Sequence, residues 1–477
     1  MGAARSGIAC AKFLVARGAT VALNDSKPIE DWGSEALALK SQGVGILPGD
    51  VPGWLLDQTE LVVISPGIPS TAIPIRYAER AGADVIGEVE LASRYLKGRI
   101  VAITGSNGKT TTTSLIGALL KNAGIPTQVG GNIGTPLISM VETSTDDGWT
   151  VVEMSSFQLE TIREFHPAIA VVLNVTPNHM DRYESFTDYA AAKHRIFMNQ
   201  VPGDLAVLNA DDKIVSSWAT GLRAHVAGFS VKRELDEGLF LRGREIVSRT
   251  PIAERVLLMS DEMKLRGRHN VENVLAALAV GLACGAAPES MRQTVANFEP
   301  VEHRLELVSE IEGVTFYNDS KATSVDATLK ALEAFGDVDD EASDKSGKVV
   351  LILGGRGKKA PYAPLASLVS SNVRKLILIG EDADTIAAQL GDFAVYDRAR
   401  DMKDAVALSF QAAKPGDTVL LAPACASFDM FESFEHRGKV FKDEVLELKS
   451  KVQKELKSKV QSPKSKVEDC LSSEPPA

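Results

Sequence analysis

The sequence is poor in cysteine, in aromatic residues and in positive charge. Its 477 residues include four cysteines (Cys10, Cys284, Cys425 and Cys470), all far apart and none in a CxxC pair. This pattern fits neither a disulfide framework nor a zinc knuckle, and it suits a reducing cytosol. Aromatic residues make up 6% and the formal net charge is −11, which argues against a protein that binds nucleic acid.

Long apolar runs are missing as well. No stretch of eighteen apolar residues occurs, so the sequence predicts no membrane-spanning helix and no membrane partner. The N-terminus does not resemble a signal peptide, because Lys12 and Arg17 interrupt its short apolar stretches. We therefore expect a cytoplasmic protein that acts as a monomer.

Short apolar runs that alternate with amphipathic stretches dominate the chain instead. This texture is typical of buried parallel strands joined by helices, so it predicts an α/β fold. Ligands bind to such sheets at the carboxyl ends of the strands, where candidate site residues are therefore sought. The predicted strands lie at 20–23, 61–64, 100–103, 150–152, 170–173, 349–353, 376–379 and 418–421.

The chain divides into three blocks and a tail. Three domains agree with the chain length, because a domain usually has ~150 residues. We place the blocks at 1–97, 98–300 and 301–448, with an acid-rich loop at 337–348 inside the third. Residues 449–477 are rich in lysine and poor in apolar side chains, which predicts a disordered tail.

The strongest single motif is a glycine-rich turn between a predicted strand and a predicted helix. Residues 100–110 read Ile-Val-Ala-Ile-Thr-Gly-Ser-Asn-Gly-Lys-Thr. Gly105 and Gly108 let backbone amides point at phosphate oxygens, and the helix N-terminus adds partial positive charge. Lys109 would reach the outer phosphates and Thr110 would bind Mg²⁺, although the first glycine of the full phosphate-loop pattern is absent. The predicted nucleotide-binding residues are Gly105, Ser106, Asn107, Gly108, Lys109, Thr110 and Thr111.

Polar residues at later strand ends are candidates for metal binding. Glu153 ends the next strand, where a carboxylate suits Mg²⁺ but is equally compatible with an ordinary polar strand end. His179 and Asp181 follow another strand in a polar loop at the same expected edge. Lys193 lies among alanines in a predicted helix, and this pattern alone favours a lysine that reaches out to solvent.

Taken together, the ordered motifs resemble the Mur ligases, which build the stem peptide of peptidoglycan. In the central block the matching segments are 104–110, 153–158, 178–183, Lys193 and 267–270. In the third block, segments 318–323, 423–429 and 434–438 are similar to the members that add D-glutamate. The resemblance covers all three blocks and excludes the lysine-rich tail.

This resemblance implies an ATP-dependent ligase that joins D-glutamate to UDP-N-acetylmuramoyl-L-alanine through an acyl phosphate. The implied architecture has a Rossmann-like UDP-substrate domain, a central phosphate-loop ATPase domain and a Rossmann-like C-terminal domain. It also implies two Mg²⁺ ions and a carbamylated Lys193, which reverses the earlier interpretation of this residue. Burial beside alanines would lower the pKa of its amine and favour the neutral form that adds CO₂.

The resemblance also implies roles for individual residues. The implied catalytic residues are Lys109, Glu153, His179 and Lys193, with the metal held by Thr110, Glu153, His179 and Lys193. Nucleotide contacts are implied for Asn270, Arg304 and Asp319. Substrate contacts are implied for Ser6, Ser26, Lys27, Gly67, Asn132, Lys321, Thr323, Lys358, Ser427 and Phe434.

The N-terminal block departs from the family pattern. Residues 2–7 form the turn that follows a first strand, but only Met1 precedes them. We therefore expect a sheet without its first strand, an exposed strand edge and a weakened UDP site. Alternative interpretations are a ligase similar to folylpolyglutamate synthase and a phosphate-loop ATPase without ligase chemistry. A nicotinamide oxidoreductase is disfavoured, because Ala4 replaces the middle glycine of the dinucleotide-binding turn.

Overall fold

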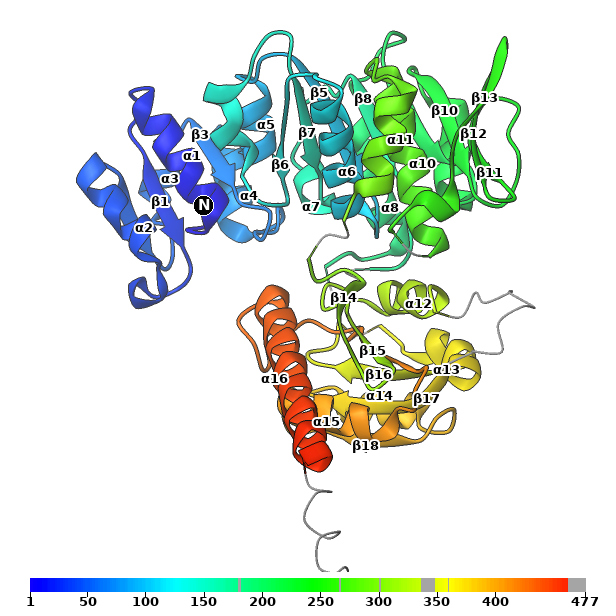
Figure 1. Ribbon diagram of the computed structural model, residues 1–477. Helices are drawn as coiled ribbons and strands as arrows, with labels where there is room; N and C mark the ends of the chain where they lie inside the picture. Colours follow the sequence, from blue (N-terminus) through cyan, green and yellow to red (C-terminus); the bar gives the residue numbers. More distant parts are fainter. Residues whose placement is uncertain (179–181, 266, 300–301, 336–347, 359, 462–477) are drawn as a thin grey trace, which may run out of the picture. The chain divides into compact units, whose positions relative to one another are not determined.

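The computed structural model describes residues 1–178, 182–265, 267–299, 302–335, 348–358 and 360–461 (Figure 1). These residues belong to two compact units. The first comprises Met1–Pro177 and Arg182–Glu299, and the second comprises Asn178–Asp181 and Pro300–Ala477. Within the described ranges, no helix is long and apolar enough to span a membrane.

The first unit begins with two separate two-stranded parallel sheets. The strands β1 (Ala22–Asp25) and β2 (Gly45–Pro48) form one sheet, and β3 (Leu61–Ile64) and β4 (Asp84–Gly87) form the other. Each sheet has its own small apolar cluster. The accompanying helices are α1 (Arg5–Ala16), α2 (Ser34–Ala38), α3 (Gly53–Leu56), α4 (Ile73–Ala81) and α5 (Glu88–Ser93).

Met1 and Gly2 bridge the two small sheets. The Met1 amino group donates to the Val63 carbonyl oxygen (2.6 Å), and the Met1 carbonyl oxygen accepts from the Ser65 amide (3.0 Å). The Gly2 amide donates to the Asn24 carbonyl oxygen (2.7 Å). Met1 thus pairs with the end of β3 while its neighbour pairs with β1, so these two residues occupy the position expected of a strand between them. In the described residues, β1 and β3 belong to separate sheets, and Met1 and Gly2 contact one of them each.

An apolar strand added before Met1 is expected to stabilise this part of the protein. It would pair with β1 and β3, join their apolar clusters and replace a charged amino group, whose pKa is lowered by burial, with a neutral amide. Burying two Val or Ile side chains contributes ~1.5–3 kcal/mol each. At ~2–4 °C per kcal/mol, we expect Tm to rise by at least about 5 °C in calorimetry. An equally long Gly-Ser extension is the control, and an equal Tm for both extensions would contradict the prediction.

A nine-stranded sheet forms the rest of the first unit, in the order β13-β12-β11-β10-β9-β8-β5-β7-β6. Neighbouring strands from β6 to β11 are parallel, whereas β11, β12 and β13 form an antiparallel ribbon at one edge. The strands are β5 (Arg99–Thr104), β6 (Thr127–Gly131), β7 (Trp149–Glu153), β8 (Ile169–Val172), β9 (Leu205–Asn209), β10 (His225–Ser230), β11 (Gly238–Arg242), β12 (Glu245–Thr250) and β13 (Ala253–Met259).

Helices α6, α10 and α11 cover one face of this sheet (Figure 1). Their side chains and alternate strand residues form one continuous apolar core. The phosphate-loop helix α6 packs directly against α10 in this core. The helices of this region are α6 (Lys109–Asn122), α7 (Ser156–Leu159), α8 (Phe186–His194), α9 (Lys213–Ser217), α10 (Arg268–Ala283) and α11 (Pro288–Asn297).

Ion pairs join the outer strand β13 to its neighbours. Glu254 on this strand contacts Arg242 (2.8 Å) and Arg249 (2.6 Å), and Arg249 also contacts Glu234 (2.8 Å). The first four residues of β13 are exposed. This charged ribbon was not predicted, because its strands lack the uniformly apolar runs of the buried parallel strands.

The second unit is a six-stranded sheet in the order β14-β15-β19-β16-β17-β18. All neighbours are parallel except β14, which is antiparallel to β15. Alternate residues of β16 enter two apolar clusters, Leu351 on one face and Val350 and Ile352 on the other. The strands are β14 (Glu306–Ile311), β15 (Val314–Asn318), β16 (Val349–Gly354), β17 (Val373–Ile379), β18 (Tyr396–Arg398) and β19 (Thr418–Leu421).

Helices cover both faces of the second sheet, as in a doubly wound fold. One cluster includes α12, α13 and α14, and the other includes α15 and α16. This arrangement agrees with the predicted Rossmann-like C-terminal domain. The helices are α12 (Val325–Glu333), α13 (Ala366–Asn372), α14 (Ala383–Leu390), α15 (Met402–Ala412) and α16 (Phe434–Gln461).

Helix α16 extends into the segment that was predicted to be a disordered tail. It continues through Lys449 to Gln461, so the prediction of disorder is wrong for 449–461. Val452 packs against the apolar cluster beneath the helix, and Glu447 pairs with Lys451 one turn later (2.6 Å). These contacts stabilise a segment whose composition alone suggested disorder. Residues 462–477 and the acid-rich loop, apart from Lys348, lie outside the described residues.

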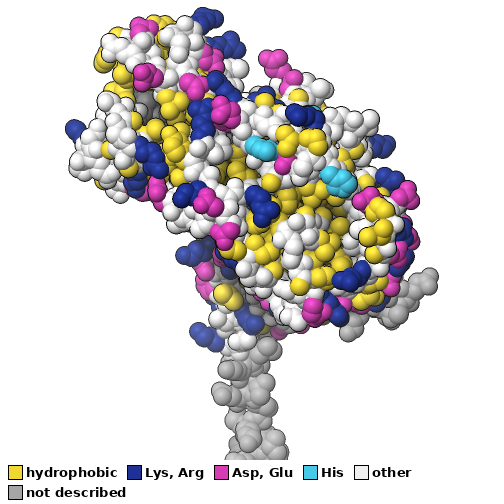
Figure 2. Space-filling model, turned by 90° about the horizontal axis from the view of Figure 1, so that it is seen from above, with side chains coloured by type: hydrophobic (Ala, Val, Ile, Leu, Met, Phe, Trp, Pro, Cys, Tyr) yellow, Lys and Arg dark blue, Asp and Glu magenta, His cyan; other side chains and the backbone are white. Residues whose placement is uncertain are grey.

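Charges of both signs are mixed on the surface. On the face seen in Figure 2, lysine and arginine side chains alternate with acidic ones around a broad apolar area. That face therefore has no basic stripe of the kind that tracks a nucleic-acid backbone.

Candidate active site

The predicted phosphate loop joins β5 to α6, as the sequence indicated. Gly105 and Gly108 have positive φ values of 158° and 83°. A Cβ atom on Gly108 would lie 2.3 Å from Oδ1 of Asn273, so only glycine fits beside α10. The loop therefore curls tightly into the N-terminus of α6, where backbone amides can receive an anion.

Asn174 and Tyr189 hold this loop, although neither was predicted as a site residue. The Ser106 amide donates to the Asn174 carbonyl oxygen (2.9 Å), and the Asn107 amide donates to Asn174 Oδ1 (2.8 Å). The Ser106 hydroxyl lies 3.0 Å from the Tyr189 hydroxyl. Asn174 directly follows the strand predicted at 170–173, and this position at a strand end was the available signal.

Lys109 folds back over the loop. Its Nζ donates to the carbonyl oxygens of Gly105 (2.8 Å) and Ser106 (3.0 Å). Thr110 and Thr111 follow in the buried first turn of α6. The lysine charge is thus positioned at the mouth of the loop, where the outer phosphates of a nucleotide would lie.

Two predicted site residues, Thr110 and Asn132, contact the buried carboxylate of Glu153. The side chain is 1% exposed, at the end of β7. The Thr110 hydroxyl donates to its Oε2 (2.9 Å), and Asn132 Nδ2 donates to its Oε1 (2.8 Å). A hydroxyl and a carboxylate side by side are hard oxygen donors of the kind that Mg²⁺ prefers. His179, predicted as a further ligand, lies outside the described residues, as does Asp181.

Lys193 points into the protein, contrary to what its sequence pattern alone suggested. It is 1% exposed, and its Nζ donates to the Gly105 carbonyl oxygen (2.8 Å) and lies 4.7 Å from the centre of the Tyr189 ring. Burial and the nearby Lys109 charge lower the pKa of Lys193 well below its ordinary value, and Glu153 opposes them. Two lysine nitrogens therefore share one carbonyl oxygen, which favours a neutral, nucleophilic amine at Lys193.

Asn270 lies beside the phosphate-loop helix. It is buried in the first turn of α10, and its Oδ1 accepts from Asn273 Nδ2 (3.0 Å). Asn273 Oδ1 in turn accepts from the Thr112 hydroxyl on α6 (3.3 Å). This chain of hydrogen bonds places the predicted nucleotide contact at the N-termini of two adjacent helices.

Three of the four predicted UDP-substrate residues of the N-terminal block follow strands, and the fourth lies at the start of a helix. Ser26 and Lys27 follow β1, and Ser6 lies in the first turn of α1. The Asp25 carboxylate joins these turns by accepting from the amides of Ala3 (2.8 Å) and Lys27 (3.1 Å). Gly67, in the loop after β3, is the remaining predicted contact of this block.

In the second unit, the predicted nucleotide contacts Arg304 and Asp319 are adjacent. Asp319 follows β15 and is buried, which raises its pKa to about 6 although the Arg304 charge opposes the shift. The residues on either side of Arg304, His303 and Leu305, both have left-handed backbone (φ 63° and 42°). Arg304 is therefore held in a sharply constrained turn.

The predicted amino-acid-binding residues also lie in this unit. Lys321 Nζ lies 4.7 Å from the centre of the Phe434 ring, and Lys358 Nζ donates to the Thr323 hydroxyl (3.2 Å). Ser427 is buried in the loop after β19. Each of the two lysines therefore contacts another member of the predicted set.

Arg437 was not predicted as a site residue, although it belongs to the matched segment 434–438. This arginine is 1% exposed and donates to the carbonyl oxygens of Ser320 (2.8 Å) and Cys425 (3.2 Å). Burial lowers its pKa to about 10. It ties the loop after β15 to the loop after β19, so it supports both sides of the predicted pocket.

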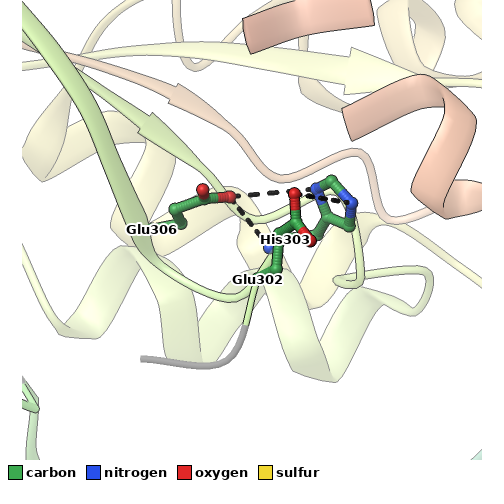
Figure 3. Close-up of side chains that lie close together, drawn as sticks. All are labelled: Glu302, His303 and Glu306. Carbon is green, nitrogen blue, oxygen red and sulfur yellow. Dashed lines mark hydrogen bonds and ion pairs between the residues drawn. The ribbon is translucent and has the colours of Figure 1, made fainter. Parts of the chain in front are cut away.

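Glu302, His303 and Glu306 lie close together next to Arg304, with His303 buried and Glu302 exposed (Figure 3). Its donor set could hold a metal, but Lys442 already contacts Glu302 (2.9 Å) and Glu306 (2.6 Å). Asn318 Nδ2 lies 2.9 Å from His303 Nδ1, and burial lowers the pKa of this imidazole. The cluster is therefore an ion-pair network that fixes α16 to the turn.

Replacing Lys442 by alanine is expected to destabilise the second unit. Glu302 and Glu306 would lose their cation, which we expect to lower the free energy of unfolding by about 1–2 kcal/mol. Denaturant unfolding of the full chain measures this change. Lys454→Ala removes an exposed lysine farther along α16 and is the control. Equal stability of the two variants would show that the network contributes nothing.

Comparison with known proteins agrees with these features. Three family models match: "Mur ligase MurD-like, N-terminal domain" at residues 1–87, "Mur ligase middle domain" at 103–281, and "Mur ligase, glutamate ligase domain" at 303–425. Most of the described residues therefore lie within a matched segment.

Curated relatives match along nearly their whole length. The UDP-N-acetylmuramoylalanine–D-glutamate ligase of Koribacter versatilis (strain Ellin345) is 47% identical over 443 residues, covering 93% of this chain and 95% of the relative. The ligase of the same name from Solibacter usitatus (strain Ellin6076) is 47% identical over 454 residues, covering 94% and 98%.

Solved structures share the fold at low sequence identity. A pseudomurein peptide ligase type C from Methanothermus fervidus has a TM-score of 0.59 at 16% identity, covering 94% of this chain and 98% of that one. A UDP-N-acetylmuramate-alanine ligase from Thermotoga maritima has a TM-score of 0.57 at 19% identity, covering 93% and 97%.

Proposed function

Since this chain belongs to the Mur ligase family, we propose that it is the ATP-dependent ligase that joins D-glutamate to UDP-N-acetylmuramoyl-L-alanine in peptidoglycan synthesis. The observation that carries this proposal is the convergence of Lys109 and Lys193 on the Gly105 carbonyl oxygen, beside the buried Glu153 carboxylate. Such a site suits phosphoryl transfer, which depends on positioning and charge neutralisation. Relatives that are 47% identical carry the corresponding ligase name.

The proposed reaction has two steps. The L-alanine carboxylate of the UDP substrate attacks the γ-phosphorus of ATP, which gives an acyl phosphate and releases ADP. The D-glutamate amine then attacks the acyl carbon, loses a proton and expels phosphate to leave an amide. Lys109 would exchange its bonds to the Gly105 and Ser106 carbonyl oxygens for bonds to phosphate oxygens.

The residues present fit magnesium. Thr110, Glu153, His179 and a carbamylated Lys193 would hold it, because they supply hard oxygen donors and an imidazole. Bound Mg²⁺ neutralises charge on phosphoryl oxygens. Carbamylation joins the neutral Lys193 amine to CO₂ with loss of a proton, so an uncharged nitrogen becomes an anionic group with oxygen donors. Without carbamylation, Lys193 would supply no anionic oxygen ligand beside Glu153.

The loops of the second unit would bind D-glutamate. Its two carboxylates would pair with Lys321 and Lys358, and the hydroxyls of Thr323 and Ser427 would add hydrogen bonds. Phe434, which lies against Lys321, would supply an apolar wall. Both cations belong to loops that Arg437 and neighbouring backbone hold in place.

Substrate dependence tests this function. Phosphate release from ATP in the presence of UDP-N-acetylmuramoyl-L-alanine is expected to be at least about 100-fold faster with D-glutamate than with L-glutamate or glycine. Comparable rates with L-glutamate would overturn the assignment. Release without any amino acid would instead favour a simple ATPase, and dependence on a folate substrate would favour the folylpolyglutamate-type alternative.

We further propose the domain limits 1–97, 98–300 and 301–448, a cytoplasmic location and a monomeric state. The N-terminal block, the central sheet and the second unit have separate apolar clusters, which supports three folding domains. Peptidoglycan precursors that carry UDP are made where nucleotides are available, and this requirement supports the cytoplasm.

A further inference from the structure

Arg182 joins the loop after β3 to the central sheet domain of the first unit. Its guanidinium donates to the carbonyl oxygens of Pro66 (3.2 Å), Gly67 (3.2 Å) and Ile68 (3.1 Å). These three consecutive carbonyls lie in a turn closed by a hydrogen bond from the Ile68 amide to the Ser65 carbonyl oxygen (2.9 Å). One side chain thus binds nearly the whole loop.

The base of Arg182 is rigid. Its guanidinium carbon lies 4.1 Å from the centre of the Phe157 ring, and the next residue, Tyr183, stacks on the same ring at 5.9 Å. The Tyr183 hydroxyl donates to Glu160 Oε1 (2.5 Å). Phe157 lies on α7, which the Ser155 capping box stabilises at its start. Cation–π contact and stacking together fix the direction of the guanidinium.

The geometry requires a planar, multiply donating cation. Three carbonyl dipoles directed at one point repel each other unless a positive charge lies between them. Arginine offers five N–H donors in a fixed plane, whereas a lysine ammonium at the same place is a compact point charge on a flexible stem. The loop conformation therefore depends on this particular side chain.

The loop that Arg182 binds lies at a crevice beside helix α7. Ser65, Pro66 and Ile68 line one side of a crevice, and Phe157 and Gln158 on α7 line another. Helix α7 begins three residues after the Glu153 carboxylate. Arg182 therefore couples the position of the Gly67 loop to the strand end that carries the proposed metal site.

We propose that Arg182 is a positioning residue that holds the loop 65–68 in the conformation that binds the UDP-sugar substrate. This inference rests on the proposed function, because that function supplies the substrate that Gly67 would contact. Arg182 itself acts through the three carbonyls and not on the reacting atoms. It sets substrate affinity by keeping the loop ordered before binding.

Two variants test the proposal. Arg182→Gln is expected to raise the KM for UDP-N-acetylmuramoyl-L-alanine at least about tenfold and to leave the KM for ATP and D-glutamate within about twofold, because only the first substrate uses the loop. Arg182→Lys retains the charge without the planar fork, so we expect an intermediate KM. Hydrogen exchange of the Ser65, Gly67 and Ile68 amides should quicken in both variants, with or without substrate.

Arg163→Gln is the matched control. Arg163 also connects the N-terminal block to the central domain, through an ion pair with Asp84 and a hydrogen bond to the Val85 carbonyl oxygen (2.9 Å), but it does not touch the loop. Equal KM values for Arg182→Gln and Arg163→Gln, or unchanged exchange at 65–68, would overturn the inference. A wild-type protein that shows no turnover of the UDP substrate would instead overturn the proposed function, and the exchange measurement would still decide the role of Arg182.

Discussion

Replacing Lys193 by alanine is expected to lower turnover at least about 10³-fold, the scale of losing a charged group that stabilises phosphoryl transfer, while ATP still binds. The residue is buried and its amine shares the Gly105 carbonyl oxygen with Lys109. If Lys193 is carbamylated, its removal deletes an anionic metal ligand but leaves the phosphate loop intact. Steady-state kinetics and equilibrium binding of ATP separate the two effects.

Two further measurements make this test specific to the carbamate. Wild-type activity is expected to fall in buffer stripped of CO₂ and to return when bicarbonate is added, whereas Lys193→Ala responds to neither. Lys121→Ala, which removes an exposed lysine at the end of α6, is the control. Near wild-type turnover in Lys193→Ala would refute the carbamate.

Glu153→Gln is expected to lower turnover about 10²–10³-fold, as when one electrostatic partner of a transition state is removed. The amide is isosteric, so Asn132 and Thr110 retain neighbours while the negative charge is lost. We also expect the Mg²⁺ concentration that gives half-maximal activity to rise at least about tenfold, since a carboxylate ligand would become a weaker carbonyl ligand.

A titration of activity with Mg²⁺ in both proteins measures this shift. Glu142→Gln changes an exposed carboxylate that only contacts Arg17 on the surface, so it serves as the control. An unchanged Mg²⁺ requirement in Glu153→Gln would show that Glu153 merely orders Thr110 and Asn132 and does not hold the metal.

The buried parallel strands could be predicted because their apolar runs are local signals. The runs at 61–64, 100–103 and 418–421 coincide with β3, β5 and β19 to within one residue at each end. The antiparallel ribbon β11–β13 escaped prediction, because exposed strands alternate in polarity and carry charges such as Glu254. Helix α16 beyond Lys449 escaped for a related reason, since the packing of Val452 and the Glu447–Lys451 ion pair stabilise it and composition reveals neither contact.

The same holds for the site: features that depend on neighbouring residues could be predicted from spacing, and contacts between residues distant in sequence could not. The phosphate loop follows from adjacent residues, so Gly105 and Lys109 were identified from spacing alone. Lys193 lies far from the loop in sequence, and the structure brings its nitrogen to the Gly105 carbonyl oxygen. The family resemblance predicted a carbamylated metal ligand at Lys193, and it did not predict this contact. Asn174 follows a predicted strand and Arg437 lies in a matched segment, but both were missed because their hydrogen bonds reach parts of the chain that are distant in sequence.

The ion pairs along β13 make the free edge of the nine-stranded sheet dependent on ionic strength. An unpaired strand edge is a template for pairing with another chain, and charges on it oppose such pairing. The protection here is electrostatic, because Glu254 and its two arginine partners are surface groups. Salt at 1 M reduces the screening length to about 3 Å, so it would weaken this protection. Storage in concentrated salt would therefore favour self-association through this edge. In dilute buffer, the charges would oppose pairing of another strand with β13.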